Sequence, residues 1–206
     1  LVYFWIPQRV SYLWLLGASY FFYMSWNPGY ALLLLGVTLI SWGGSMGLSL
    51  LDGRKAERAK RGCLAGCIAL NLGILFFFKY YVFAAENMEK LLALLRISVK
   101  LSVFDVLLPV GISFYTFQAP GYLLDVYRGD IPAEKNFLRY ALFLAFFPQL
   151  VAGPVERSKN LLHQIDESHV FEPGRVKDGL LLMGWGFFQK LVIADRIAVA
   201  VNAVYG

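Results

Sequence analysis

The sequence is poor in charge. Of its 206 residues only 16% are charged, whereas 58% are hydrophobic and the mean hydropathy is +0.57. Soluble domains carry about 25% charged residues, and a soluble chain of this length exposes too much surface to hide so many apolar side chains. Disordered chains are excluded as well, because they lack aromatic and aliphatic residues. The composition therefore predicts a membrane protein with several transmembrane helices.

Cysteine and histidine are also scarce, with two residues of each. A structural zinc site needs four ligands. Cys63 and Cys67 have no further Cys or His near them, so we interpret them as small packing residues of a membrane helix. His163 and His169 stand six apart in a polar segment, a poor spacing on a helix. We interpret them as ordinary interfacial histidines rather than general bases.

Common soluble-enzyme motifs are missing: there is no GxSxG, P-loop, GxGxxG or HExxH sequence. The net charge is +5, but the basic residues lie in short clusters between apolar runs. Single-strand binders instead interleave basic and aromatic residues along a groove. Nucleic acid is therefore not expected as a partner, and the lipid bilayer is.

Three apolar runs have about the 20 residues that a transmembrane helix needs. They cover residues 10–26, 30–51 and 62–83, and the first two predict a helical hairpin. The loop 52–61 holds five Lys and Arg residues. The positive-inside rule places this loop in the cytoplasm, with lipid head-group binding as an alternative role for its charges.

The remaining segments are less regular. Residues 86–101 predict an amphipathic helix lying in the membrane interface. Residues 103–127 are apolar but interrupted by Pro and Gly, so we expect them to be buried among helices rather than to face lipid. Residues 137–152 are short for a span and predict a half-span or re-entrant element. The last run, 179–206, contains charged residues that should face a cavity, the bundle interior or the interface.

The expected fold class is therefore all-α: a polytopic transmembrane bundle with an interfacial helix and broken segments. No internal repeat or soluble linker divides the chain, so we expect one transmembrane domain over residues 1–206. The first residue is Leu1 rather than Met, and the last stretch is still strongly apolar. We expect the chain to be a fragment of a longer protein.

Two stretches combine helix breakers, amides and charges inside apolar sequence. They are LPVGISFYTFQ (108–118), which continues to DVYRG (125–129), and FPQLVAGPVER (147–157). Membrane proteins build polar cavities with such segments, because irregular backbone and polar groups are tolerated only away from lipid. Packing kinks and interfacial caps would give the same pattern, and both interpretations stay open on the residues alone.

With these two motifs the chain resembles the membrane-bound O-acyltransferase family, in its bacterial branch of alginate O-acetyltransferase-like proteins. The last run, GWGFFQKLVIADRIAVAVNAVY, is similar to a family segment with a Lys followed by an Ala-Asp pair. The resemblance covers nearly the whole chain. Pro120 departs from it, since the family usually has another residue there, and the local helix is expected to kink differently.

The resemblance implies a multi-pass enzyme of the bacterial inner membrane that passes an acyl group to a hydroxyl on the far side. It implies no bound cofactor, a cytoplasmic acyl donor such as acetyl-CoA, and an exported polysaccharide reached through a periplasmic or extracellular partner protein. The family's catalytic His lies in an apolar segment of the C-terminal half, beyond residue 206, and neither His163 nor His169 matches it. This chain alone is therefore expected to be inactive.

Seven polar residues are candidates for lining a substrate tunnel or holding it open: Gln118, Asp125, Arg128, Gln149, Arg157, Lys190 and Asp195. Asp125 and Arg128 are three apart and would meet on a helix face. Lys190 and Asp195 form a second candidate pair. For each residue taken alone, a structural role such as capping or helix-end pairing is favoured over contact with substrate.

Two other functions remain open. One is D-alanyl transfer to teichoic acid, within the same family. The other is a non-enzymatic transporter or assembly partner that shares the scaffold. A transporter would predict inverted halves with interrupted segments at corresponding positions, and the sequence does not have them.

Overall fold

The computed structural model describes residues 2–25, 27–51, 56–94, 109, 111–153, 156–167 and 170–205. These residues contain helices and no strand, which confirms the all-α fold class. The chain divides into two compact units, Ile6–Glu167 and a smaller one formed by Leu1–Trp5 with Ser168–Gly206. Each unit is described by itself.

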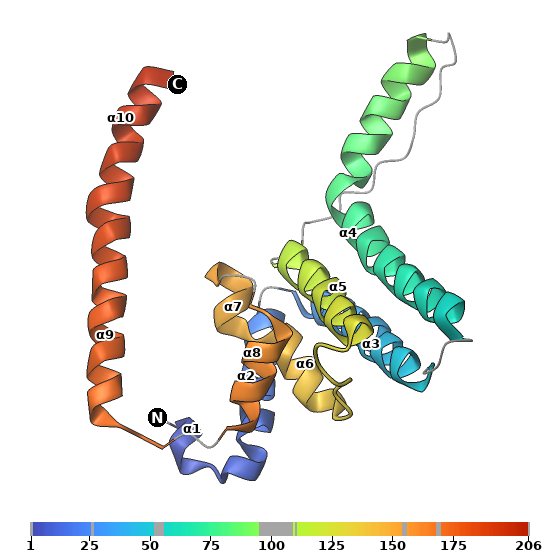
Figure 1. Cartoon of the computed structure of the whole chain (residues 1–206). Helices are drawn as coiled ribbons and strands as arrows, with labels where there is room; N and C mark the ends of the chain where they lie inside the picture. The colour runs from blue at the N-terminus through green and yellow to red at the C-terminus, as the bar shows by residue number, and fades with distance from the viewer. Residues whose placement is uncertain are drawn as a thin grey trace. The chain divides into compact units, whose positions relative to one another are not determined.

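Seven helices are described in the larger unit (Figure 1): α2 (Gln8–Met24), α3 (Pro28–Leu50), α4 (Glu57–Leu94), α5 (Ile112–Arg128), α6 (Phe137–Ala145), α7 (Phe147–Ala152) and α8 (Ser158–Asp166). Helices α2 and α3 pack together as the predicted hairpin. The Asn27 side chain accepts a hydrogen bond from the backbone N–H of Gly29 at 2.9 Å. This cap satisfies one of the free N–H groups at the start of α3.

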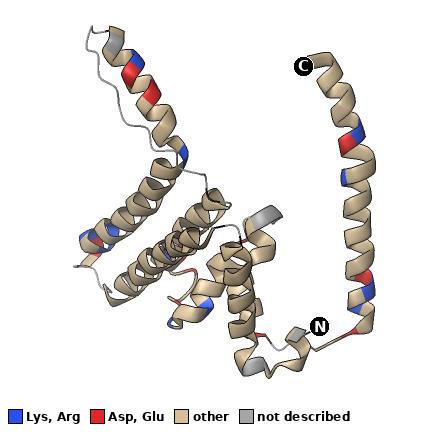
Figure 2. Cartoon of the chain, turned by 180° about the vertical axis from the view of Figure 1, so that it is seen from behind, with Lys and Arg blue, Asp and Glu red and all other residues tan. Residues whose placement is uncertain are grey.

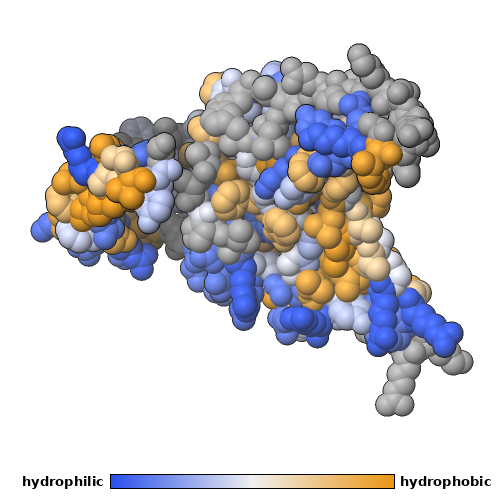
Figure 3. Space-filling view, turned by 90° about the horizontal axis from the view of Figure 1, so that it is seen from above, coloured by the Kyte–Doolittle hydropathy of each residue, from blue (hydrophilic) through white to orange (hydrophobic). Residues whose placement is uncertain are grey.

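Two described helices are long and apolar enough to cross a membrane, Pro28–Leu50 and Glu57–Leu92. They correspond to the predicted spans at 30–51 and 62–83. On α4 the large side chains Leu70, Phe76 and Phe83 are exposed, and Figure 3 shows broad hydrophobic areas on the face that it views. Such a surface suits contact with lipid or with further apolar helices rather than with water.

Two predictions about α4 are wrong. The helix begins at Glu57, so Arg58, Lys60 and Arg61 lie on its first turns and not in a loop. Residues 86–94 continue the same helix instead of forming a separate one, because no Gly or Pro interrupts the sequence after Phe83. The halves of α4 nevertheless run in different directions (Figure 1). The rest of the predicted amphipathic helix, 95–101, lies outside the described residues.

Helix α5 is the buried centre of this unit. It packs against α3, α4, α6 and α8. Its tyrosines Tyr115 and Tyr122 are fully buried, together with Tyr140 and Phe143 of α6. The prediction that this segment is buried among helices is therefore confirmed for most of residues 112–128, although Phe117 is exposed. Residues 103–108 and 110 lie outside the described part.

The predicted interruption at Pro120 and Gly121 is wrong, since α5 runs through both residues. A proline removes one helical hydrogen bond, a loss that buried helices tolerate when neighbours hold the backbone in place. The helix begins instead after Gly111, whose φ is +72°. A Cβ at this position would lie 2.9 Å from the carbonyl oxygen of Leu150, so both the conformation and the close approach require glycine.

The segment 137–152 consists of two short helices, α6 and α7, which meet at Phe146. That it is a half-span or re-entrant element stays a prediction. Phe146 has an extended ψ of 104°, and Pro148 stands in the first turn of α7, where its missing N–H costs nothing. After this break, Gln149 and Gly153 line a cavity together with residues of α8.

The smaller unit contains α1 (Val2–Trp5), α9 (Pro173–Phe188), the π-helical turn η2 (Gln189–Ala194) and α10 (Asp195–Tyr205). The last three form one continuous rod (Figure 1). Figure 2 shows charged residues on this rod only near its start and around its middle. At the middle, Lys190 forms an ion pair with Asp195, as the sequence predicted.

Candidate functional site

A polar cavity of about 220 Å³ lies beside the C-terminal half of α5. Its walls come from α5, the turn that follows it, and the start of α8. The lining residues are Phe117, Gln118, Gly121, Tyr122, Leu124, Asp125, Arg128, Asp130, Glu156, Arg157 and Ser158. Four of the seven sequence candidates, Gln118, Asp125, Arg128 and Arg157, therefore share one cavity. Their role as tunnel lining stays a prediction.

Hydrogen bonds from three helices fix the cavity wall. The Ser158 hydroxyl of α8 donates to Asp125 Oδ2 of α5 at 2.6 Å, and Ser158 is only 2% exposed. Gln118 Nε2 donates to the carbonyl oxygen of Phe143 on α6 at 3.4 Å. Because both bonds join α5 to a neighbouring helix, they hold polar groups of the lining in fixed positions.

The charges of the lining have both signs. Arg128 and Arg157 are exposed and provide guanidinium donors, which suit phosphate, carboxylate or carbonyl oxygens. Asp125, Asp130 and Glu156 provide acceptors for hydroxyl and amide donors. The groups of this lining can therefore bind and orient a polar ligand through both donors and acceptors.

A second cavity, of about 310 Å³, lies next to α7 and α8 and is more apolar. It is lined by Phe146, Pro148, Gln149, Gly153, Glu156, Leu161 and Gln164, so Glu156 belongs to both cavities. Gln149, the fifth candidate, is 8% exposed. A Cβ on Gly153 would lie 2.6 Å from Gln149 Cα, which explains why glycine ends α7 here.

The other sequence candidates lie elsewhere. Lys190 and Asp195 belong to the smaller unit, where the backbone N–H of Asp195 bonds to the carbonyl oxygen of Lys190. This five-residue π pattern brings the two side chains together, whereas an ordinary α-helix pairs residues three or four apart. His163 is exposed, its Nδ1 lies 3.1 Å from Glu167 Oε1, and it lines neither cavity. His169 lies outside the described residues.

No group of three or more His, Cys, Asp or Glu residues that could hold a metal ion occurs in the described part of the chain. The candidate site is thus a pair of cavities without a metal centre among those residues.

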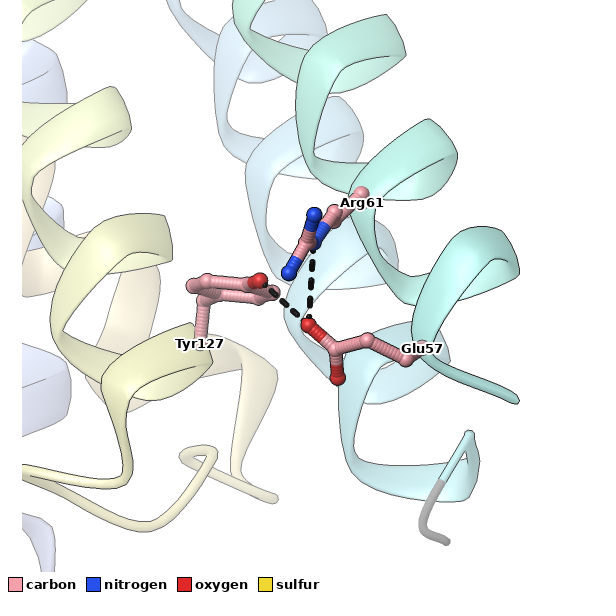
Figure 4. A network of polar contacts seen from close by, with 3 residues as sticks. All are labelled: Glu57, Arg61 and Tyr127. Carbon is pink, nitrogen blue, oxygen red and sulfur yellow. Dashed lines mark hydrogen bonds and ion pairs between the residues drawn. The ribbon is translucent and has the colours of Figure 1, made fainter. Parts of the chain in front are cut away.

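Sequence reasoning missed several residues around the site. No motif in the sequence marks Ser158, and its hydrogen bond to Asp125 is visible only in the structure. Glu57, Arg61 and Tyr127 form a further polar network (Figure 4). Tyr127 donates to Glu57 Oε1 at 2.8 Å, and Arg61 Nε lies 3.1 Å from the same oxygen.

The network lies before the apolar run of α4. Glu57 accepts the hydrogen bond from Tyr127 and lies beside the Arg61 guanidinium. It ties the start of α4 to the last turn of α5, one residue before Arg128.

Comparison with known proteins shows which proteins this sequence resembles. The chain is 37% identical over 203 residues, 98% of its length, to a probable alginate O-acetylase AlgI of Pseudomonas putida. It is 32% identical over 90% of its length to a peptidoglycan O-acetyltransferase of Helicobacter pylori. A teichoic acid D-alanyltransferase of Lacticaseibacillus rhamnosus matches more weakly, at 26% identity over 57% of the chain.

The resemblance to the alginate O-acetylase-like branch of the membrane-bound O-acyltransferases is confirmed. The chain spans 41% of the P. putida relative and 39% of the H. pylori relative, so it corresponds to part of such a protein. No protein-family model matches it, and no solved structure matches it closely enough to add to this comparison. Both cavities lie within the part of the chain that these two relatives share with it.

Proposed function

We propose that the full-length protein is a membrane O-acyltransferase that acetylates hydroxyl groups of an exported polysaccharide or another cell-envelope polymer. The observation that carries this proposal is the match over nearly the whole chain to relatives named alginate O-acetylase and peptidoglycan O-acetyltransferase. In such a transfer an ester bond forms to the acceptor oxygen, the bond between the acyl carbon and the donor breaks, and the hydroxyl proton leaves with the donor group.

The described part of the chain would form a wall of the tunnel that the substrates enter. Gln118, Arg128 and Arg157 would bind and orient a polar group, while Asp125 holds the wall in place through Ser158. The more apolar cavity around Gln149 lies next to it and would take a less polar part of the same substrate.

The charge distribution supports a cytoplasmic opening of this cavity. Arg58, Lys60 and Arg61 lie at the start of α4, the end that the positive-inside rule assigns to the cytoplasm. Tyr127, at the end of α5, bonds to Glu57 at the same end. The cavity beside this turn would therefore face the cytoplasm, where an acyl donor such as acetyl-CoA is available.

This arrangement suits a multi-pass protein of the bacterial inner membrane. Donor and acceptor would approach from opposite sides, and a periplasmic or extracellular partner would present the exported polymer. Passing only the acyl group through the tunnel avoids the large cost of moving a charged carrier across the bilayer.

The test is the acetyl content of the cell's polymer. Bacteria that produce the full-length protein with its operon partners should carry O-acetyl esters on the exported polysaccharide, measured by NMR, and a deletion strain should lose them. An unchanged ester content in the deletion strain would refute the proposal.

The weaker match to a teichoic acid D-alanyltransferase supports a second candidate, transfer of D-alanine to teichoic acid. The same two strains decide between them, because D-alanyl esters released by mild alkali would then replace the acetyl esters. A transporter without acyltransferase activity predicts neither ester.

A further inference from the structure

The last turn of α5 is held from two sides. On one side Asp125 accepts the hydrogen bond from Ser158 of α8. On the other side Tyr127 donates to Glu57 of α4. Arg128 follows Tyr127 directly and lines the cavity with Asp125. The position of Arg128 therefore depends on two hydrogen bonds that join α5 to separate helices.

On the α4 side, three residues contribute contacts to this arrangement: Glu57, Arg61 and Lys60. Glu57 Oε1 accepts from Tyr127 at 2.8 Å, and Arg61 Nε lies 3.1 Å from that oxygen. The Lys60 ammonium lies 5.7 Å from the centre of the Tyr127 ring, within reach of a cation–π interaction. Figure 4 shows Tyr127 pointing from α5 toward Glu57 and Arg61. A residue of α5 that does not line the cavity is thus fixed by several groups of α4.

We propose that Tyr127 and Glu57 are positioning residues for the cavity: their hydrogen bond fixes the last turn of α5 and so places Arg128 for substrate. The proposal rests on the proposed acyl transfer. Neither residue lines the cavity, so both act through Arg128.

This role predicts an effect on binding rather than on the chemical step. Arg128 provides a charged donor to the part of the substrate that occupies the cavity, and it cannot itself supply or accept the acyl group. A hydrogen bond to a charged group contributes enough free energy for about a tenfold effect, and a displaced Arg128 loses part of its own contact.

The experiment compares full-length variants in lipid nanodiscs, with acetyl-CoA as the donor. Y127F and E57A should raise the KM for acetyl-CoA roughly three- to tenfold and leave kcat within about twofold. E57Q keeps an acceptor oxygen and should stay closer to wild type than E57A. The double variant Y127F/E57A should be no worse than either single variant, since both remove the same contact. Y80F, at an exposed tyrosine of α4, is the matched control.

Hydrogen exchange on the same samples tests the contact without any activity. Backbone amides of residues 125–130 should exchange faster in Y127F and E57A than in the wild type. Their exchange rates should be unchanged in Y80F. Unchanged exchange in Y127F would overturn the proposal. Faster exchange with an unchanged KM would show a purely structural contact and overturn the positioning role.

If the wild-type protein transfers no acetyl group from acetyl-CoA, that result counts against the proposed function with this donor. The positioning role is then tested by adding increasing concentrations of acetyl-CoA and measuring the hydrogen-exchange rates of the same amides. Weaker protection of residues 125–130 by acetyl-CoA in Y127F than in Y80F would support it. Equal protection, or none in the wild type, would overturn it.

Discussion

Helix α5 and the rod Pro173–Tyr205 place polar residues inside apolar sequence in different ways. In α5, Gln118, Tyr122 and Asp125 find partners on other helices. In the rod, no described residue is buried, and Lys190 pairs with Asp195 of the same rod through a π turn. A polar group in a membrane segment needs a partner. The comparison shows that the partner can come from tertiary packing or from a local irregularity of the helix.

The first way to test this comparison is to remove a large apolar side chain from each region. F143A in the packed core of the larger unit should lower the free energy of unfolding by about 3–5 kcal/mol, because it leaves a cavity. Phe143 is 1% exposed and Phe187 of α9 is 61% exposed, so F187A should cost less than about 1 kcal/mol. Denaturation of the detergent-solubilised protein measures both. Equal losses would contradict the difference in packing.

The second test concerns the self-contained pair of the rod. K190D replaces the ion pair by two acidic side chains. It should make the apparent free energy of membrane insertion of segment 173–205 less favourable by roughly 1–3 kcal/mol. The swapped variant K190D/D195K contains the same charges as the native rod and should insert like it. A glycosylation-based insertion assay compares the three sequences. If the swap inserts no better than K190D, the pair does not stabilise the rod.

A third test uses glycines. A Cβ on Gly44 of α3 would lie 2.5 Å from Cys67 Sγ of α4, so G44A should destabilise the larger unit by about 1–3 kcal/mol. C67A should restore most of this loss by removing the sulfur. At Gly184 of α9 a Cβ meets no atom within 4 Å, and G184A should be neutral or slightly stabilising. Thermal unfolding of G44A, G44A/C67A and G184A checks these outcomes, and a stable G44A would contradict the close packing of α3 on α4.

The smallest expected effect is at the cavity wall. S158A removes the hydrogen bond to Asp125 and should cost about 1.5 kcal/mol, the lower end for a bond to a charged group. S49A, at an exposed serine that bonds only within α3, should change the unfolding free energy by less than about 0.5 kcal/mol. Equal values for the two variants would mean that the Ser158–Asp125 bond does not hold α8 on α5.

The local features of this fold follow from the sequence, and the long-range contacts do not. Hydropathy predicted the two long apolar helices α3 and α4, whereas the third predicted span, 10–26, corresponds to the shorter apolar helix Val10–Met24. Helix breakers with amides marked the segments that line the cavities. The same reasoning failed at Pro120, where packing of α5 keeps the helix intact, and at residues 86–94, where nothing breaks α4. It could not find Ser158 or Glu57, since their partners lie 33 and 70 residues away. The Lys190–Asp195 pair was predicted, but not the π turn that allows it, because helical spacing rules assume pairs three or four apart.

The central claim is that residues distant in the sequence form one substrate cavity at the end of α5. It is tested most directly by R128A and R157A in the full-length protein, with K159A on the exposed face of α8 as the control. At equal protein levels in the membrane, both cavity variants should lower the acetyl content of the exported polysaccharide at least tenfold, measured by NMR, and K159A should match wild type. Full acetylation by both R128A and R157A would contradict the account.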